Sequence, residues 1–395
     1  MHLLETYALS TGSKIGEPFI LKKFFPVKYE KYITLQNSSG MPSKCYDYFQ
    51  ETINFLLPML QKHGIGIVQI GGPEDYPLNN VENLQGKTNI HQTAYIINNS
   101  LLHLGNDSFA IHMASAFGVK CVGLYSITLP EIAGPFYNKK NSICLYPDSE
   151  KPSFNPNESP KRINKIKPEE VASACLKLLF KDSEKCDSKT LYIGDRYKET
   201  IIESIPDNVI HPDFFKNAVL NIRCDYVNNI DLNILYTNLA TRKCCIVTDK
   251  PFDLTPIPQV KNNITIIIYN ITDNLNMDFI AELEKTGVKY VCAFNKGGNT
   301  QEDLNSKKTQ LIDYCAVEEF NLIPENFDLN IIKNSGLKYK SNRILLSNGN
   351  LFSSSAAFFE NLNSQNAEDL SFNLDLIQNK NKFLEDLDYC MIYKD

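Results

Sequence analysis

The residues with the clearest chemical potential lie in the run Leu101–Gly118, LLHLGNDSFAIHMASAFG. Its apolar start predicts a buried strand, its polar middle a tight turn, and the residues from Phe109 a helix. A helix that starts directly after a strand points its free backbone N–H groups at the turn, so an anion such as a phosphate can bind there. Asp107 and Ser108 stand at the helix cap, and His112 follows one turn later on the same face. An ordinary capped junction has the same local pattern, so the neighbouring segments must decide.

Further turns of this kind occur on both sides of the run. Residues 64–70 predict another buried strand, which leads into the turn Gly71-Gly72-Pro73-Glu74. The segment 84–88, LQGKT, precedes a helical pattern, and residues 119–125 predict a strand that leads to Gly134-Pro135. Strands that alternate with helices predict βαβ crossovers and a parallel sheet covered on both faces.

Taken in order, these pieces resemble the nucleotide-sugar-binding half of the heptosyltransferase-like glycosyltransferases (glycosyltransferase family 9), over about residues 1–180. The resemblance rests on five pieces: a small-hydroxyl turn with a lysine, a Gly-Gly-x-Glu turn, a Leu-x-Gly-x-Thr segment, an Asp-Ser turn followed by a histidine, and a Pro-containing loop. They are Ser38, Ser39 and Lys44; Gly71, Gly72 and Glu74; Leu84 to Thr88; Asp107, Ser108 and His112; and Gly134-Pro135. Phe109 departs from the pattern, because the family has a glycine there. The backbone is therefore expected to approach a diphosphate less closely, or at a different angle.

The resemblance implies a set of donor-binding residues: Ser38, Ser39, Lys44, Gly71, Gly72, Glu74, Thr88, Asp107, Ser108, Phe109 and His112. Lys44 is expected to face a phosphate, the alternative being a solvated lysine at a helix start. Because a bare carboxylate repels phosphate, Asp107 is assigned to a sugar hydroxyl or to capping. His112 either donates a hydrogen bond to the diphosphate or is a satisfied core histidine. Glu74 either accepts from ribose hydroxyls or is a surface carboxylate.

Transfer also requires a base that deprotonates the acceptor hydroxyl. In the family this is an aspartate in a Gly-Asp turn after the first strand of the acceptor domain. Here Gly194-Asp195 follows the first strand expected in the second half, so Asp195 is the catalytic candidate, with an ordinary capped turn as the alternative. Transferases of this type usually work without a bound metal, so neither a metal nor another cofactor is expected. Asp386 and Asp388 are interpreted as a solvated acidic face.

Composition limits the class of protein. At 395 residues the chain is too long for one ordinary domain and suits two. A net charge of −6 argues against broad affinity for nucleic acid. No run reaches the ~18 apolar residues of a membrane span, and residues 1–5 do not begin a signal peptide, so a cytoplasmic location is expected. The 11 cysteines form no Cys-x-x-Cys pair, and we expect them to be reduced and mostly packed.

The alternating pattern predicts α/β architecture with two Rossmann-like, doubly wound domains, which the resemblance makes GT-B-like. The nucleotide-sugar domain is expected at 1–182, a second α/β domain, possibly acceptor-binding, at 188–337, and a C-terminal appendage at 338–395. Family members normally place the acceptor domain first. Either the second half replaces that domain, or a second chain completes the cleft.

The implied function is transfer of a sugar from a nucleoside-diphosphate donor to a hydroxyl acceptor, in glycan or lipopolysaccharide-type synthesis. Two alternatives remain open. One is a non-catalytic or partner-dependent protein that binds a nucleotide sugar. The other is a glycosyltransferase that acts on modified nucleic acid, for which a basic groove would be needed. The basic clusters are short: Arg242-Lys243, Lys307-Lys308, and Lys338 with Lys340.

Overall fold

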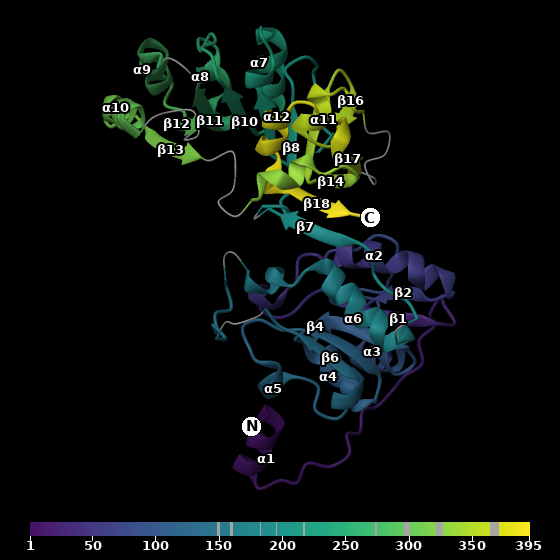
Figure 1. Ribbon diagram of the computed structural model, residues 1–395. Helices are drawn as coiled ribbons and strands as arrows, with labels where there is room; N and C mark the ends of the chain where they lie inside the picture. Colours follow the sequence, from purple (N-terminus) through teal and green to yellow (C-terminus); the bar gives the residue numbers. More distant parts are fainter. Residues whose placement is uncertain are drawn as a thin grey trace. The chain divides into compact units, whose positions relative to one another are not determined.

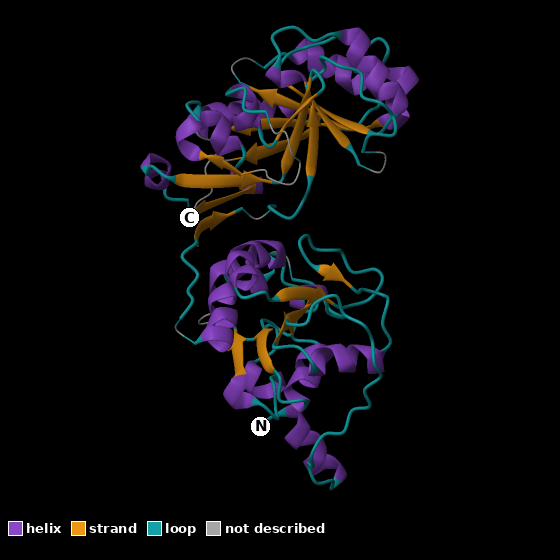
Figure 2. Cartoon of the chain, turned by 90° about the vertical axis from the view of Figure 1, so that its right-hand side faces the viewer, coloured by secondary structure: helices purple, strands orange, loops and turns teal. Residues whose placement is uncertain are grey.

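The computed structural model describes residues 1–147, 151–158, 161–181, 183–194, 196–215, 218–272, 275–295, 301–320, 327–363 and 371–395. The chain divides into two compact units, Met1–Thr190 and Leu191–Asp395 (Figure 1). Each unit has its own sheet with helices packed on it, as the orange strands and purple helices of Figure 2 show. Within the described residues, none of the helices combines the length and the apolar character that crossing a membrane requires.

The first unit contains a six-stranded parallel sheet in the order β3-β2-β1-β4-β5-β6. Its strands are β1 (Tyr32–Gln36), β2 (Gly66–Gln69), β3 (Glu82–Asn83), β4 (Leu102–Asn106), β5 (Lys120–Leu124) and β6 (Ser142–Leu145). From β1 the chain winds outward to β3, then returns to the other side of β1 and winds outward to β6. The sheet is therefore doubly wound, and its winding reverses between β1 and β4.

Helices cover both faces of this sheet, as the apolar strands require. Every residue of β1 and of β4 is buried, which is typical of central parallel strands. Helix α2 packs against α6, and α3 packs against α4. The helices of the unit are α1 (Leu3–Thr11), α2 (Phe49–Lys62), α3 (Ile90–Asn98), α4 (Phe109–Ala116), α5 (Pro130–Ala133) and α6 (Pro168–Phe180), with short 3₁₀ turns η1 (Pro42–Lys44), η2 (Lys139–Asn141) and η3 (Arg162–Lys165).

The second unit is built on an eight-stranded sheet in the order β13-β12-β11-β10-β9-β8-β15-β16. Strands β8 to β13 follow one another in chain order and run parallel, and β15 joins the free side of β8, also parallel. The strands are β8 (Ile201–Ser204), β9 (Leu220–Arg223), β10 (Cys244–Thr248), β11 (Ile264–Ile271), β12 (Tyr290–Asn295), β13 (Ala316–Phe320), β15 (Arg343–Ser347) and β16 (Asn350–Phe352), and the helices between β9 and β13 are α7 (Leu232–Thr241), α8 (Ile257–Val260), α9 (Met277–Thr286) and α10 (Gln301–Leu311). The expected α/β architecture is thus confirmed in both units.

A four-stranded sheet, ordered β17-β14-β18-β7, completes the second unit. It contains β7 (Lys189–Ile193), β14 (Leu337–Ser341), β17 (Ser371–Asn373) and β18 (Cys390–Lys394), accompanied by α11 (Ser355–Phe359) and α12 (Lys380–Glu385). The remaining 3₁₀ turns are η4 (Cys224–Tyr226), η5 (Lys261–Asn263), η7 (Leu329–Lys333), η8 (Leu374–Leu376) and η9 (Leu387–Tyr389).

This small sheet corrects two expectations. The strand before Asp195, β7, lies in the four-stranded sheet and does not open the parallel one. The residues beyond 338 are not a peripheral appendage, because β15 pairs with β8 inside the eight-stranded sheet and β18 pairs with β14. The physical reason is that apolar residues such as Cys390 and Ile392 are fully buried, although the surrounding composition is rich in Asn and Ser.

Candidate functional site

The candidate site begins at the point where the winding of the first sheet reverses. β1 and β4 are neighbours there, with Gln36 opposite Gly105. The loops that follow the two strands meet, because the Ser39 hydroxyl donates to the Asp107 carbonyl oxygen at 3.3 Å. Ligands of doubly wound sheets bind at the carboxyl ends of strands at such a reversal. The fold therefore places Ser39 and Asp107 where a ligand is expected.

Asp107 is the centre of this site and is almost fully buried. Its backbone N–H donates to the carbonyl oxygen of Leu124, which fixes the turn to β5. Its Oδ2 accepts from Lys44 Nζ at 2.5 Å and from Thr128 Oγ1 at 2.6 Å. Its Oδ1 lies 3.9 Å from His112 Nε2. One carboxylate thus joins η1, the loop after β5 and the first turn of α4.

Asp107 Oδ2 thus accepts from two donors, whereas Oδ1 lies 3.9 Å from His112 Nε2. The expectation that the carboxylate meets a sugar hydroxyl or caps the helix stays a prediction. Lys44 ends η1, which begins at a proline, and its side chain is 16 % exposed. A largely buried ammonium held in one place by a carboxylate is a pre-organised cation.

The start of α4 offers unused hydrogen-bond donors. Ser108, the N-cap residue, is extended, and its side chain makes no capping hydrogen bond. In the described structure, no hydrogen bond satisfies the backbone N–H groups of Phe109, Ala110 and Ile111. Such N–H groups, together with the helix dipole, bind anions. Phe109 keeps a negative φ at this position, and its ring is 43 % exposed.

Two further buried polar groups lie unsatisfied at the same edge of the sheet. Gln36 is the last residue of β1 and Asn106 the last of β4, and both are almost fully buried. Within the described part of the chain, Gln36 Oε1 and Asn106 Nδ2 have no hydrogen-bond partner. Unpaired buried polar atoms are rare in folded proteins. Their presence at both strands of the reversal marks this edge as a place for a polar ligand or ordered water.

His112 adds a ring that is neutral near pH 7. Burial lowers its pKa, and the Asp107 carboxylate opposes that effect only in part. The charges of His2 and Lys44 lower the His112 pKa as well. His2 Nδ1 accepts from the backbone N–H of Leu4, so its Nε2 donates to the Gly134 carbonyl oxygen at 2.9 Å. The Gly134 loop and α1 are thus fastened beside the candidate site.

The Gly71-Gly72 turn is held by the carboxylate of Asp75. Asp75 Oδ2 accepts from the backbone N–H of Gly72 at 2.7 Å and from Ser38 Oγ at 2.6 Å. Gly71 has a φ of 154°, and a Cβ there would clash with the Asp75 carboxylate. Asp75 is therefore the carboxylate that ties the loops after β1 and β2 together, whereas its neighbour Glu74 is exposed.

The structure thus brings some of the expected residues together and leaves others apart. Ser39, Lys44, Asp107 and His112 form one contact group around Asp107. Thr88 bonds instead to Thr93 Oγ1 at 2.9 Å. Asp195 lies outside the described residues. Sequence reasoning missed Thr128 and Asp75, although the second of these directly follows Glu74 in the Gly-Gly-Pro-Glu-Asp run and was visible as the second of two carboxylates.

Metal ligands do not gather in the described portion of the chain, where no group of three or more His, Cys, Asp or Glu side chains has a suitable arrangement. The charged groups of the candidate site include Lys44, Asp107 and Asp75, together with the terminus of α4.

Comparison with known proteins shows what the region that contains this site is similar to. No curated protein matches the chain. Similar solved structures include the ADP-heptose lipopolysaccharide heptosyltransferase II of E. coli, at 17% identity over 46% of this chain and 52% of that chain, with a TM-score of 0.31. A family 9 glycosyl transferase from Veillonella parvula DSM 2008 has 22% identity over 39% of this chain and 47% of that chain, with a TM-score of 0.33. The E. coli heptosyltransferase WaaC with ADP has 18% identity over 36% of this chain and 48% of that chain, with a TM-score of 0.27.

This chain spans about half the length of those solved proteins. Residues 14–163 match the family model described as Glycosyltransferase family 9 (heptosyltransferase). The match contains β1 to β6 and every residue of the Asp107 group, which confirms the resemblance seen in the sequence. The region that carries the candidate site is therefore similar to glycosyltransferase family 9, the heptosyltransferase family.

Proposed function

We propose that this protein transfers a sugar from a nucleoside-diphosphate donor to a hydroxyl acceptor, and that the donor diphosphate binds at the start of α4. The observation that carries the proposal is the row of unsatisfied backbone N–H groups at Phe109 to Ile111, which stands beside the buried Lys44–Asp107 pair at the winding reversal of the sheet. The family 9 match over residues 14–163 supports it independently.

The residues suit stabilisation of a departing diphosphate. The N–H groups of α4 and the Lys44 ammonium offer positive charge where negative charge grows on the leaving group. Asp107 and Thr128 position that ammonium. His112 is neutral and can donate one further hydrogen bond. Because these groups supply the charge, we propose transfer without a resident metal, which full activity in the presence of EDTA would support.

The base that deprotonates the acceptor stays a prediction at Asp195. The strand before it, β7, belongs to the four-stranded sheet, so its place at the opening of a parallel crossover no longer supports the choice. What supports it is the Gly-Asp pair alone. Asp195→Asn should keep donor binding and lower transfer by ~10²–10⁴-fold, as loss of a positioned base does. Transfer at the parent rate by this variant would show that another residue serves as the base.

Donor binding is the first experiment. Calorimetry on the full chain would test ADP, UDP, GDP and CDP, with ADP first because a similar solved heptosyltransferase is described with ADP. A ligand at ~100 times its dissociation constant should also stabilise the fold by ~2.7 kcal/mol. Lys44→Ala should weaken binding at least tenfold, since a charged hydrogen bond contributes ~1.5–3 kcal/mol. Lys177→Ala, which removes an exposed lysine of α6, is the matched control.

Two outcomes would contradict the proposal. One is that no nucleoside diphosphate or nucleotide sugar binds the parent protein. The other is that Lys44→Ala binds as tightly as Lys177→Ala, which would remove Lys44 from the site. A cytoplasmic location also stays a prediction, and cell fractionation would test it.

A second function is favoured by two observations: Phe109 stands where the family has a glycine, and the family match ends at residue 163. In that case the chain binds a nucleotide sugar and depends on a second protein for transfer. A parent protein that binds the donor, but transfers the sugar only when a second protein is added, would establish this function. Transfer by the purified chain alone would exclude it.

A further inference from the structure

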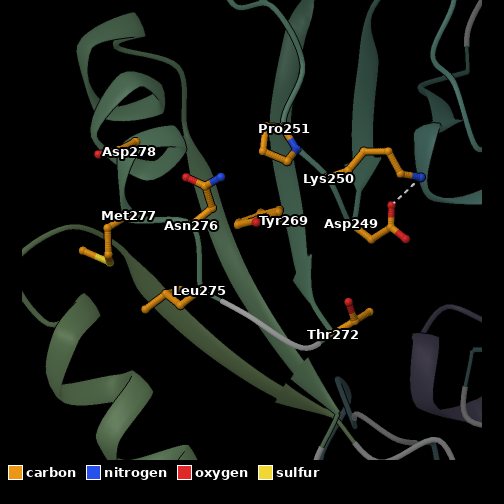
Figure 3. Close-up of a pocket in the computed structure, with 9 residues that line it drawn as sticks. All are labelled: Asp249, Lys250, Pro251, Tyr269, Thr272, Leu275, Asn276, Met277 and Asp278. Atoms are coloured by element: carbon orange, nitrogen blue, oxygen red, sulfur yellow. Dashed lines mark ion pairs between the residues drawn. The ribbon is translucent and has the colours of Figure 1, made fainter.

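The second unit contains a cavity of about 500 Å³ at the carboxyl ends of β10 and β11 (Figure 3). The loop after β10 forms one wall, with Asp249 and Lys250. Thr272 after β11, the N-cap residue Asn276 and Asp278 in the first turn of α9 form the others, with Tyr269 between them. The volume is in the usual range for ligand sites, and carboxyl ends of parallel strands are where α/β sheets bind ligands. The family 9 match does not reach these residues.

Among the described residues that line the cavity, Lys250 is the only cation, and its ammonium already has partners. Lys250 Nζ donates to the carbonyl oxygens of Val227 at 2.6 Å and Cys224 at 3.4 Å, and it pairs with Asp249 Oδ1 at 2.7 Å. Its ammonium thus holds the loops after β9 and β10 together. An anionic ligand would find no free positive side chain in this lining.

The helix that borders the cavity does not offer an anion site either. Asn276 is the N-cap of α9, and its Oδ1 accepts from the backbone N–H of Phe279 at 3.0 Å. Asp278 stands in the first turn, where its negative charge already faces the helix dipole. A phosphate or carboxylate would therefore meet two carboxylates and a capped helix.

What the lining offers is hydrogen bonding to hydroxyl groups. The carboxylates of Asp249 and Asp278 accept from O–H groups, while the Thr272 hydroxyl and the Asn276 amide N–H groups both donate. Thr272, Asn276 and Asp278 are all exposed, so they are accessible to solvent and to a ligand. We propose that this cavity binds a neutral, hydroxyl-rich ligand, a saccharide. The site stands on the second unit alone, and only a link between it and sugar transfer rests on the proposed function.

The test is binding of the full-length protein to an array of defined neutral mono- and oligosaccharides, followed by saturation-transfer NMR with each saccharide retained. The parent should retain at least one saccharide. Asp278→Asn should weaken that binding at least tenfold, because loss of a charged acceptor removes ~1.5 kcal/mol or more. Asp249→Asn should weaken it as well. Asp278 is exposed, so its variant is expected to fold even if the loss of the Lys250 pair unfolds Asp249→Asn.

The matched control is Glu282→Gln, an exposed carboxylate one turn further along α9, which should bind like the parent. Nucleoside-diphosphate binding by Asp278→Asn, measured in parallel, should be unchanged. Nucleotide binding without any saccharide retained would overturn this inference and leave the proposed function intact. Saccharide binding without nucleotide binding would overturn the proposed function and leave this inference intact. Equal binding by the parent and Asp278→Asn would place the saccharide elsewhere.

Discussion

Each unit contains a buried group of charged residues. The two groups are similar in composition but differ in the groups that border them. In the first unit Asp107 holds Lys44 beside the start of α4. In the second unit Arg223 donates from Nη1 to Glu203 at 2.8 Å, and from Nε and Nη2 to Asp225 at 2.9 and 2.7 Å. The Arg223 guanidinium also lies 3.6 Å from the centre of the Tyr226 ring. Both groups are largely removed from water.

The second group continues into a wider buried network, in which Arg343 Nε and Glu203 Oε2 face each other without a hydrogen bond. Arg343 lies 3.5 Å from Glu203 and 3.6 Å from Asp386. Burial raises the pKa of Asp386, while Arg343 and hydrogen bonds from Ser355 and Ala356 oppose the rise. Burial alone would lower the pKa of Arg223, but Glu203 and Asp225 raise it well above its usual range. The guanidinium groups here are engaged by protein carboxylates and rings.

The Asp107 group differs because it borders the free backbone N–H groups at the start of a helix. The N–H groups of α4 and the buried amides of Gln36 and Asn106 lie at the same strand ends. Buried charge alone therefore does not identify a site in this chain. The Asp107 group is distinguished by the free backbone N–H groups of a helix start, next to a held charge at the carboxyl ends of parallel strands. The predictions below test this distinction.

The largest effect is expected from Arg223→Met. Removal of the Arg223 guanidinium leaves Asp225 buried without its cationic partner and Glu203 with Arg343 alone, which should lower the free energy of unfolding by ~3–5 kcal/mol. Urea denaturation followed by circular dichroism would measure it. Arg196→Met is the control, because its ion pair with Glu199 is exposed and should contribute ~1 kcal/mol or less. Similar losses in the two variants would show that the network is not structural.

The second effect concerns the fully buried His103, whose pKa burial lowers to about 3. The unfolded chain binds a proton near pH 6.5, whereas the folded chain does not, so stability falls as pH drops below ~6.5. The loss should be ~1.4 kcal/mol per pH unit, or ~2 kcal/mol at pH 5. Urea denaturation at pH 7, 6 and 5 would show this slope in the parent and its absence in His103→Gln. An equal dependence of stability on pH in both proteins would show that His103 does not cause it.

The third effect is smaller and tests whether Thr128 helps to position the Lys44–Asp107 pair. Thr128→Val removes the 2.6 Å hydrogen bond to Asp107 and should lower the free energy of unfolding by about 1.5 kcal/mol. It should also weaken nucleoside-diphosphate binding, because Asp107, which holds Lys44, loses the hydrogen bond from Thr128. Thr309→Val, on the exposed face of α10, should change neither property. Unchanged nucleotide affinity in Thr128→Val would exclude Thr128 from the positioning of Lys44.

Local patterns predicted much of the fold. β2 and β5 occur within the apolar runs 64–70 and 119–125 that predicted them, because hydrophobic patterns are encoded in neighbouring residues. The turn at Asp107 and the helix from Phe109 were predicted for the same reason.

The features of the fold and of the candidate site that local patterns did not predict depend on contacts between residues far apart in the sequence. Thr128 reaches Asp107 only because β4 and β5 pair, and Ser38 reaches Asp75 only because β1 and β2 pair. The pairing that puts β7 in the four-stranded sheet brings it beside β18, about 200 residues later in the chain. No local pattern near residue 190 specifies that choice of partner.

The smallest effect is expected at Phe109, and it bears on whether the Asp107 group is a working donor site. If the ring and Cβ hold a diphosphate away from the N–H groups of α4, Phe109→Gly should tighten binding by about threefold, or ~0.6 kcal/mol. Phe109→Ala separates the two causes: an equal gain assigns the effect to the ring, and a gain in the glycine variant alone assigns it to the Cβ. Calorimetry with the nucleotide that the parent binds would measure both. Weaker binding in both variants would mean that the 43 % exposed ring itself contacts the donor, and the departure from the family glycine would then be part of the binding surface.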